Sequence, residues 1–149
     1  MEFTNAQQLY AELQRRQRQA MDRMRQEALN AMRAETSAYY DGSSPRIYRR
    51  TYMLLKSPRT SAPMTSGDIM SFDAYLDRNY RYPSIQYGHQ RPSKAPTMTD
   101  VLNLTNYQTS ANSSVGYLHP AIGRPHYWER ANDRMRNIAQ NTLGSFFPR

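Results

Sequence analysis

Cysteine is absent from this 149-residue sequence, and lysine nearly so. Without cysteine the chain cannot form disulfides, zinc–thiolate sites or a thiol nucleophile, which excludes several classes of enzyme and redox protein. Hydrophobic residues make up 38% of the chain, below the roughly 45–50% of an average domain. No apolar run approaches the ~20 residues that cross a bilayer, and the first residues lack a secretory-signal pattern. We therefore expect one soluble domain over residues 1–149, with a modest core and no membrane contact.

The net charge of +8 comes almost entirely from arginine, because Lys56 and Lys94 are the only lysines. The planar guanidinium group suits carboxylate, phosphate and aromatic partners better than an ammonium group does. The excess lies mainly in residues 41–97, which hold nine basic and four acidic side chains, whereas residues 1–40 hold six and five. Nucleic acid and acidic protein surfaces are therefore plausible partners.

Catalytic motifs are missing as well. The sequence contains no G-x-x-x-x-G-K, G-x-G-x-x-G, H-E-x-x-H or G-x-S-x-G pattern. The three histidines, His89, His119 and His126, have no recognised metal-ligand spacing. Asp73 and Asp77 fall on the polar side of an expected strand, where they would lie in water. We expect a protein without enzymatic activity, cofactor or metal.

The first forty residues predict one long helix over residues 1–41. Thr4 and Gln7 have the spacing of a capping box, and Gly42 would end the helix. Apolar or small residues recur at an approximate three-four spacing, broken by Gln17, at Phe3, Ala6, Tyr10, Leu13, Ala20, Met24 and Ala31. A helix of about 36 residues is much longer than the ~12-residue average, so we expect it to be kinked or to pack along neighbouring subunits.

Residues 46–88 predict a small antiparallel sheet. A strand is expected to begin within 47–55, which is rich in β-favouring residues, and a polar linker is expected over 57–67. Strict alternation over 69–76 predicts the clearest strand. Its inward face would be formed by Met70, Phe72, Ala74 and Leu76.

The remaining chain predicts a long loop over 89–123 and a closing amphipathic helix over 124–144. Proline, serine, threonine and asparagine dominate the loop, and a loop of this length is typical of a binding segment. Pro125 suits a first helical turn and Gly144 a stop. Trp128, Met135 and Ile138 would anchor this helix on the sheet. The expected fold class is therefore α+β.

Interleaved arginine and tyrosine are typical of contact surfaces, where both residue types dominate binding energy. They could equally cover the edges of a small sheet. The candidate protein-contact residues are Arg49, Arg50, Tyr52, Tyr87, Arg91, Tyr107 and Tyr117.

Three short motifs occur in a distinctive order along the chain. They are Arg50-Thr51 with Leu54 and Ser57, then Tyr87-Gly88, then Pro125 with Tyr127 and Trp128. In this order, after a first helix, the sequence resembles the tail-completion, or head-tail joining, proteins of long-tailed bacteriophages.

The resemblance implies a small α+β subunit without enzymatic activity, assembled as a ring that is typically sixfold. Such a ring would lie in the virion between the portal-side neck and the tail, after synthesis in the host bacterial cytoplasm. Its partners would be further copies of itself and the neighbouring neck, portal and tail proteins. Non-specific contact with DNA passing through the channel is also implied.

The main alternative is a basic nucleic-acid-binding protein. Its phosphate contacts would come from the first helix, through Arg15, Arg16, Arg18, Arg23 and Arg25. Five acidic residues interspersed in the same forty residues count against it, as does the absence of a helix-turn-helix or RNA-recognition signature. Salt dependence separates the two functions, since phosphate binding weakens steeply with ionic strength.

Overall fold

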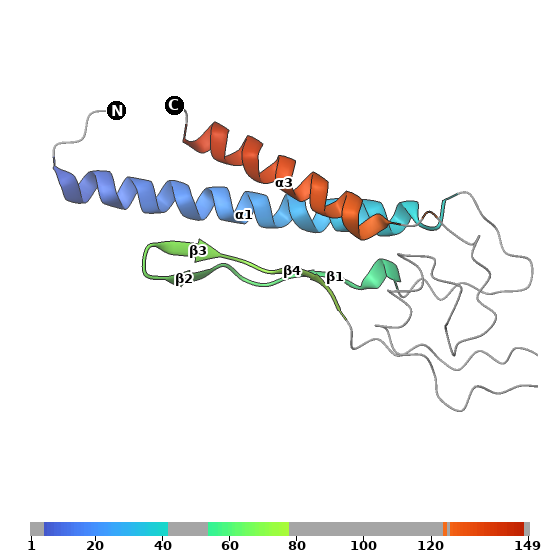
Figure 1. The fold of residues 1–149 in the computed structure, drawn as a ribbon. Helices are drawn as coiled ribbons and strands as arrows, with labels where there is room; N and C mark the ends of the chain where they lie inside the picture. The colour runs from blue at the N-terminus through green and yellow to red at the C-terminus, as the bar shows by residue number, and fades with distance from the viewer. Residues whose placement is uncertain (1–4, 42–53, 78–123, 125, 148–149) are drawn as a thin grey trace, which may run out of the picture.

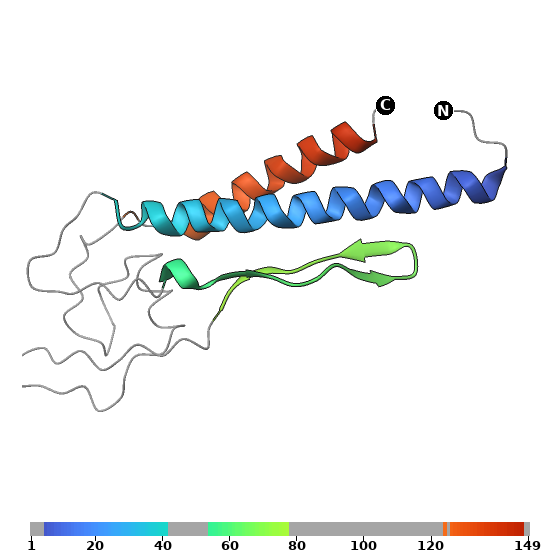
Figure 2. The same ribbon diagram turned by 180° about the vertical axis from the view of Figure 1, so that it is seen from behind.

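The computed structural model describes residues 5–41, 54–77, 124 and 126–147. Helix α1 forms the middle layer, with helix α3 along one side of it and a narrow β-ribbon along the opposite side (Figure 1, Figure 2). The elements in chain order are α1 (Ala6–Ala38), the 3₁₀ turn η1 (Leu54–Lys56), β1 (Pro58–Thr60), β2 (Met64–Ser66), β3 (Ile69–Ser71), β4 (Ala74–Leu76) and α3 (Tyr127–Phe146). The predicted α+β class is confirmed, with helix predominating in the described part.

Helix α1 runs for 33 residues. Asn5 caps its start, because the side-chain oxygen accepts a hydrogen bond of 2.9 Å from the amide of Gln8. The helix thus begins one residue later than the predicted capping box implies. It ends at Ala38, and the amide of Tyr39 donates to the Glu35 carbonyl. The predicted stop, Gly42, lies outside the described residues.

The buried face of α1 begins only at Ala20. From there alanines and methionines form one broad buried face, at Ala20, Met21, Met24, Ala28, Ala31 and Met32. The small alanines allow neighbouring elements to approach the backbone closely, and the flexible methionines fill the space between them. The earlier members of the predicted stripe, Ala6, Tyr10 and Leu13, are exposed. The apolar stripe is therefore longer than the structure that covers it.

Helix α3 packs on α1 and returns toward the N-terminus (Figure 1). The sequence predicted that this helix would lie on the sheet. The ribbon occupies the opposite side of α1, so α1 separates the two. The helix also starts and ends later than predicted. Its N-cap, His126, has a left-handed φ of 58°, and the helix continues through Gly144 to Phe146.

The four short strands form one long hairpin that is interrupted midway. β1 pairs antiparallel with β4, and β2 pairs antiparallel with β3. The two-residue turn between β2 and β3 starts at Gly67, whose φ of 59° is the positive value that a type II′ hairpin turn requires at its first position. The polar linker predicted over 57–67 is wrong, since it contains β1 and β2.

The strand predicted to begin within 47–55 is not a strand over its described residues. Leu54 and Leu55 belong to the 3₁₀ turn η1, and residues 47–53 lie outside the described part. The predicted alternation over 69–76 is confirmed in burial. One face is half-buried and the other exposed, although the ladder breaks between β3 and β4. The half-buried residues are Met70, Phe72, Ala74 and Leu76.

The most buried aromatic packing lies where the C-terminal end of α1 meets the start of α3. Tyr39, Leu54 and Tyr127 form a buried cluster there, and Leu76 and Trp128 pack against it. The ring of Tyr39 lies edge-on to that of Tyr127, with centroids 5.8 Å apart. The predicted anchors are all half-buried, namely Met70, Phe72, Leu76, Trp128, Met135 and Ile138. Each helix or ribbon outside α1 packs on one neighbouring element, so most of its side chains are only partly buried.

Candidate interaction surfaces

A buried carboxylate joins the two helices. Glu35 of α1 is 3% exposed, and its two oxygens accept separate contacts from α3. The Arg130 Nε lies 2.6 Å from Oε2, and the Arg134 Nε lies 2.9 Å from Oε1. Next to Glu35, the Thr36 hydroxyl donates to the Met32 carbonyl at 2.9 Å, which satisfies a second buried polar group. This Glu35 cluster fixes the register of α3 on α1.

The Glu35 cluster is structural in character. Burying an ion pair costs desolvation, so its net contribution to stability is small, but removing one partner leaves the other charge buried and unpaired. Glu35 was not among the residues predicted from the sequence. One signal was present, because Glu35 falls four residues after Ala31 and three after Met32, on the apolar stripe of α1. A lone acid on such a stripe predicts a basic partner on the helix that covers it.

The first turns of α1 carry exposed apolar side chains. We call residues 5–19 the α1 overhang. Leu9, Tyr10 and Leu13 are 42%, 57% and 44% exposed. Leu9 and Leu13 lie four residues apart and continue the helical face that is buried from Ala20 onward. An apolar face that is buried over one half of a helix and exposed over the other is a candidate contact surface.

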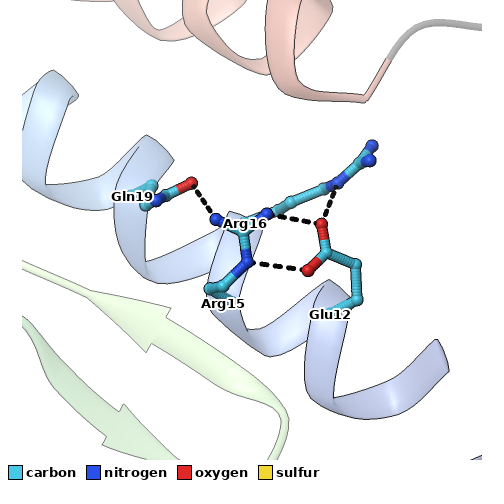
Figure 3. Close-up of polar contacts among 4 residues, drawn as sticks. All are labelled: Glu12, Arg15, Arg16 and Gln19. Atoms are coloured by element: carbon cyan, nitrogen blue, oxygen red, sulfur yellow. Dashed lines mark hydrogen bonds and ion pairs between the residues drawn. The ribbon is translucent and has the colours of Figure 1, made fainter. Parts of the chain in front are cut away.

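Ion pairs along the helix hold the arginines of the α1 overhang. Figure 3 shows the guanidinium groups of Arg15 and Arg16 both reaching back to the Glu12 carboxylate. The contacts are 2.6 and 2.7 Å from Arg15 and 2.9 Å from Arg16, and Arg15 also donates to Gln19. The hydrogen bonds from Arg15, followed by those from Arg16, lower the pKa of Glu12 to about 2. Two cations share one anion, so the network retains a positive charge.

Further along α1 other arginines also face acids. The Arg23 Nε lies 2.8 Å from Glu27, and the Arg25 Nε lies 3.8 Å from Asp22. Together with Arg15 and Arg16, four of the five arginines considered for phosphate contact thus have an acidic partner within the helix. Arg18, the fifth, is exposed. Charge that is balanced locally contributes little to a phosphate-binding surface.

The hairpin presents a second exposed apolar surface, on the face that points away from α1. We call residues 61–75 the hairpin end. Ile69 is 71% exposed, and Met64 and Tyr75 are also exposed. Its charged residues are Asp68 and Asp73, both exposed, and it contains no basic residue. No ion pair joins either aspartate to a basic residue of the described part.

The predicted protein-contact residues lie in segments that the structure does not describe. They are Arg49, Arg50, Tyr52, Tyr87, Arg91, Tyr107 and Tyr117. One arginine of the basic middle region, Arg59, is described. Its Nη1 donates to the carbonyls of Lys56 and Pro58, and its Nε lies 4.0 Å from Asp77. Arg59 therefore braces the start of β1 and the end of β4.

Metal-ligating side chains do not gather in threes anywhere in residues 5–41, 54–77, 124 and 126–147. The described histidine, His126, lies 3.9 Å from Glu129 through its Nδ1. Within the same residues neither helix is both long and apolar enough to cross a membrane. No protein-family model, curated protein or solved structure matches this chain. Its own surfaces are therefore what bears on its function.

Proposed function

We propose that this chain is a non-enzymatic structural protein that forms a ring at the head-tail junction of a tailed bacteriophage, joining the portal-side connector to the tail. The observation that carries the proposal is the α1 overhang, an apolar helical face that the described residues of the chain leave exposed. The order of the elements and the three short motifs support it by resemblance to head-tail joining proteins.

The α1 overhang favours assembly on energetic grounds. Fully burying a leucine side chain contributes about 1.5–3 kcal/mol, and Leu9 and Leu13 each retain much of that potential in the single chain. Tyr10 adds a large side chain with a polar tip, a residue type enriched at protein interfaces. A neighbouring subunit that covers this face would bury apolar area that the described part of the chain leaves exposed.

The alternative, a nucleic-acid-binding protein, is weakened by the pairing of the α1 arginines. A phosphate would have to compete with Glu12 for Arg15 and Arg16, and with Glu27 for Arg23. The proposed partners are therefore other copies of this chain and the neighbouring neck, portal and tail proteins of the virion. Contact with DNA would be non-specific and limited to its passage through the channel.

The test is the absolute mass of the purified full chain by light scattering, at low and high salt, with and without duplex DNA. A salt-resistant oligomer would support the ring. A monomer that does not bind DNA and assembles only with neck or tail components would also support the joining role. A monomer or dimer whose DNA affinity falls steeply and log-linearly with salt would overturn the proposal in favour of nucleic-acid binding.

A further inference from the structure

We infer that copies of this chain join head to tail, the α1 overhang of one copy docking on the outer face of the hairpin end of the next. The inference rests on the proposed function, because it names the two surfaces that would form the ring. The partner that covers each of these surfaces is a second copy of the same chain.

These two surfaces hold most of the exposed apolar side chains of the described residues. Among the described residues, eight large hydrophobic side chains are exposed, and six of them belong to the α1 overhang or the hairpin end. The six are Leu9, Tyr10, Leu13, Met64, Ile69 and Tyr75. Apolar side chains gathered in two patches, while the rest of the described surface is largely polar, are typical of contact surfaces.

The two surfaces carry opposite charges. The α1 overhang has three arginines and one glutamate, and the hairpin end has two aspartates and no basic residue, in a chain whose overall charge is +8. Arg16 lies three residues after Leu13 and seven after Leu9, so it shares their face of α1. It shares the single Glu12 carboxylate with Arg15, so a net positive charge remains on this surface. Asp68 directly precedes Ile69 at the tip of the hairpin. Each surface thus combines apolar side chains with a charge that the other can neutralise.

A symmetric contact is disfavoured by the same charges. Two overhangs packed on each other would bring like-charged arginines together, and two hairpin ends would bring aspartates together. A contact between different surfaces pairs opposite charges. Such a heterologous contact repeats from copy to copy, and it produces a ring when the rotation closes.

The hairpin end cannot use its outer face on its own α1. Neighbouring residues on a strand point to opposite faces, and Met70 and Phe72 are the half-buried ones. Ile69 and its cross-strand partner Ser66 therefore point away from α1, as does Met64 with its partner Ser71. A second copy could cover these residues, which the described part of the chain leaves exposed.

The experiment exchanges one charge on each surface in the full chain. Arg16→Glu and Asp68→Arg should each weaken self-association about tenfold or more, because each places like charges in the contact. The double variant should return to within about threefold of the wild type, since the exchanged charges meet across every interface. Association is measured as the concentration dependence of mass by sedimentation velocity, and circular dichroism checks that each variant is folded.

Arg23→Glu is the matched control. It reverses an exposed α1 arginine that also pairs with a glutamate four residues away, but it lies outside the α1 overhang. Its association should equal that of the wild type. An oligomer that is indifferent to Arg16→Glu and Asp68→Arg, or a double variant as weak as the sum of the single ones, would overturn this contact and leave the ring function standing. A purified chain that stays monomeric at every concentration would do the same. A steep salt-dependent affinity for DNA would overturn the function itself.

Discussion

At its C-terminal end α1 is covered on two sides, whereas over residues 5–19 the same helix keeps its apolar side chains in water. The same apolar stripe runs through both regions, with one break at Gln17. The difference arises because α3 is 20 residues long against 33 for α1 and starts at the far end of α1. Helical periodicity therefore marks a face that needs cover, while the lengths of the neighbouring elements decide how much of it is covered within one chain.

The largest difference between the two regions should appear in Tyr127→Ala and Tyr10→Ala. Tyr127 is fully buried against Tyr39 and Leu54, so its removal should destabilise the fold by about 3–5 kcal/mol. Tyr10 is more than half exposed, so its removal should cost less than about 0.5 kcal/mol in the monomer. Urea unfolding followed by circular dichroism measures both. Equal effects would contradict the assignment of the core to the C-terminal end of α1.

The second largest difference should be in the stability lost when the glutamate of a buried or of a more exposed ion pair is removed. Glu35→Ala would leave Arg130 without its buried carboxylate, and we expect a loss of about 2–3 kcal/mol. This is less than for a fully buried pair, because the Arg134 side chain is 56% exposed. Glu27→Ala, the control at a more exposed ion pair further toward the start of α1, should cost less than about 0.5 kcal/mol. A Glu35 effect as small as that of Glu27 would show that the Glu35 cluster does not hold the helices together.

Two glycines should respond to alanine with opposite signs. Gly67 has a φ of 59°, so Gly67→Ala should destabilise the hairpin by about 1 kcal/mol through backbone strain, although no atom would touch the new methyl group. Gly144 lies inside α3 in open space, so Gly144→Ala should stabilise the protein by about 0.5–1 kcal/mol. Shifts of the same sign in thermal unfolding would refute the hairpin turn or the extension of α3 beyond Gly144.

The smallest effect should come from Glu12, in the exposed region. Its pKa is lowered from 4.5 to about 2 by Arg15 and Arg16, so its contribution to stability is complete above pH 4.5 and is lost as the pH falls toward 2. Glu12→Gln should therefore be slightly less stable than the wild type at pH 7 and equal to it near pH 2. Urea unfolding at the two pH values is the measurement. A difference that persists at pH 2 would assign the effect to something other than the ion pairs.

Much of the local structure was readable from residue order. The helical spacing from Ala20 to Ala31 predicted the buried face of α1, and the alternation over 69–76 predicted the face that packs inward. The signals that misled were weak local ones. Pro58 and the polar residues after it indicated a linker, yet β1 and β2 form because β4 and β3 offer them backbone partners. Strand pairing is a tertiary interaction that local composition does not reveal.

For the candidate surfaces too, some features could be predicted from the sequence and others depend on the tertiary structure. Leu13 and the arginines of the α1 overhang were identified in the sequence, but the acidic hairpin end was not, because it lies inside the basic segment 41–97. That Leu9 and Leu13 stay exposed, and that Ile69 points away from α1, depends on where α3 and the ribbon lie. Exposure belongs to the assembled fold, so no helical or strand period predicts it by itself.

By itself the sequence determined the α+β class, the two amphipathic helices, the alternating strand and the absence of thiol chemistry, because each follows from the period or the presence of particular side chains. Only the tertiary structure decided that α3 packs on α1 and that Glu35 meets Arg130, 95 residues away. It also decided that the first turns of α1 remain uncovered. These features depend on contacts between distant segments, and their free energy arises only when both partners are in place.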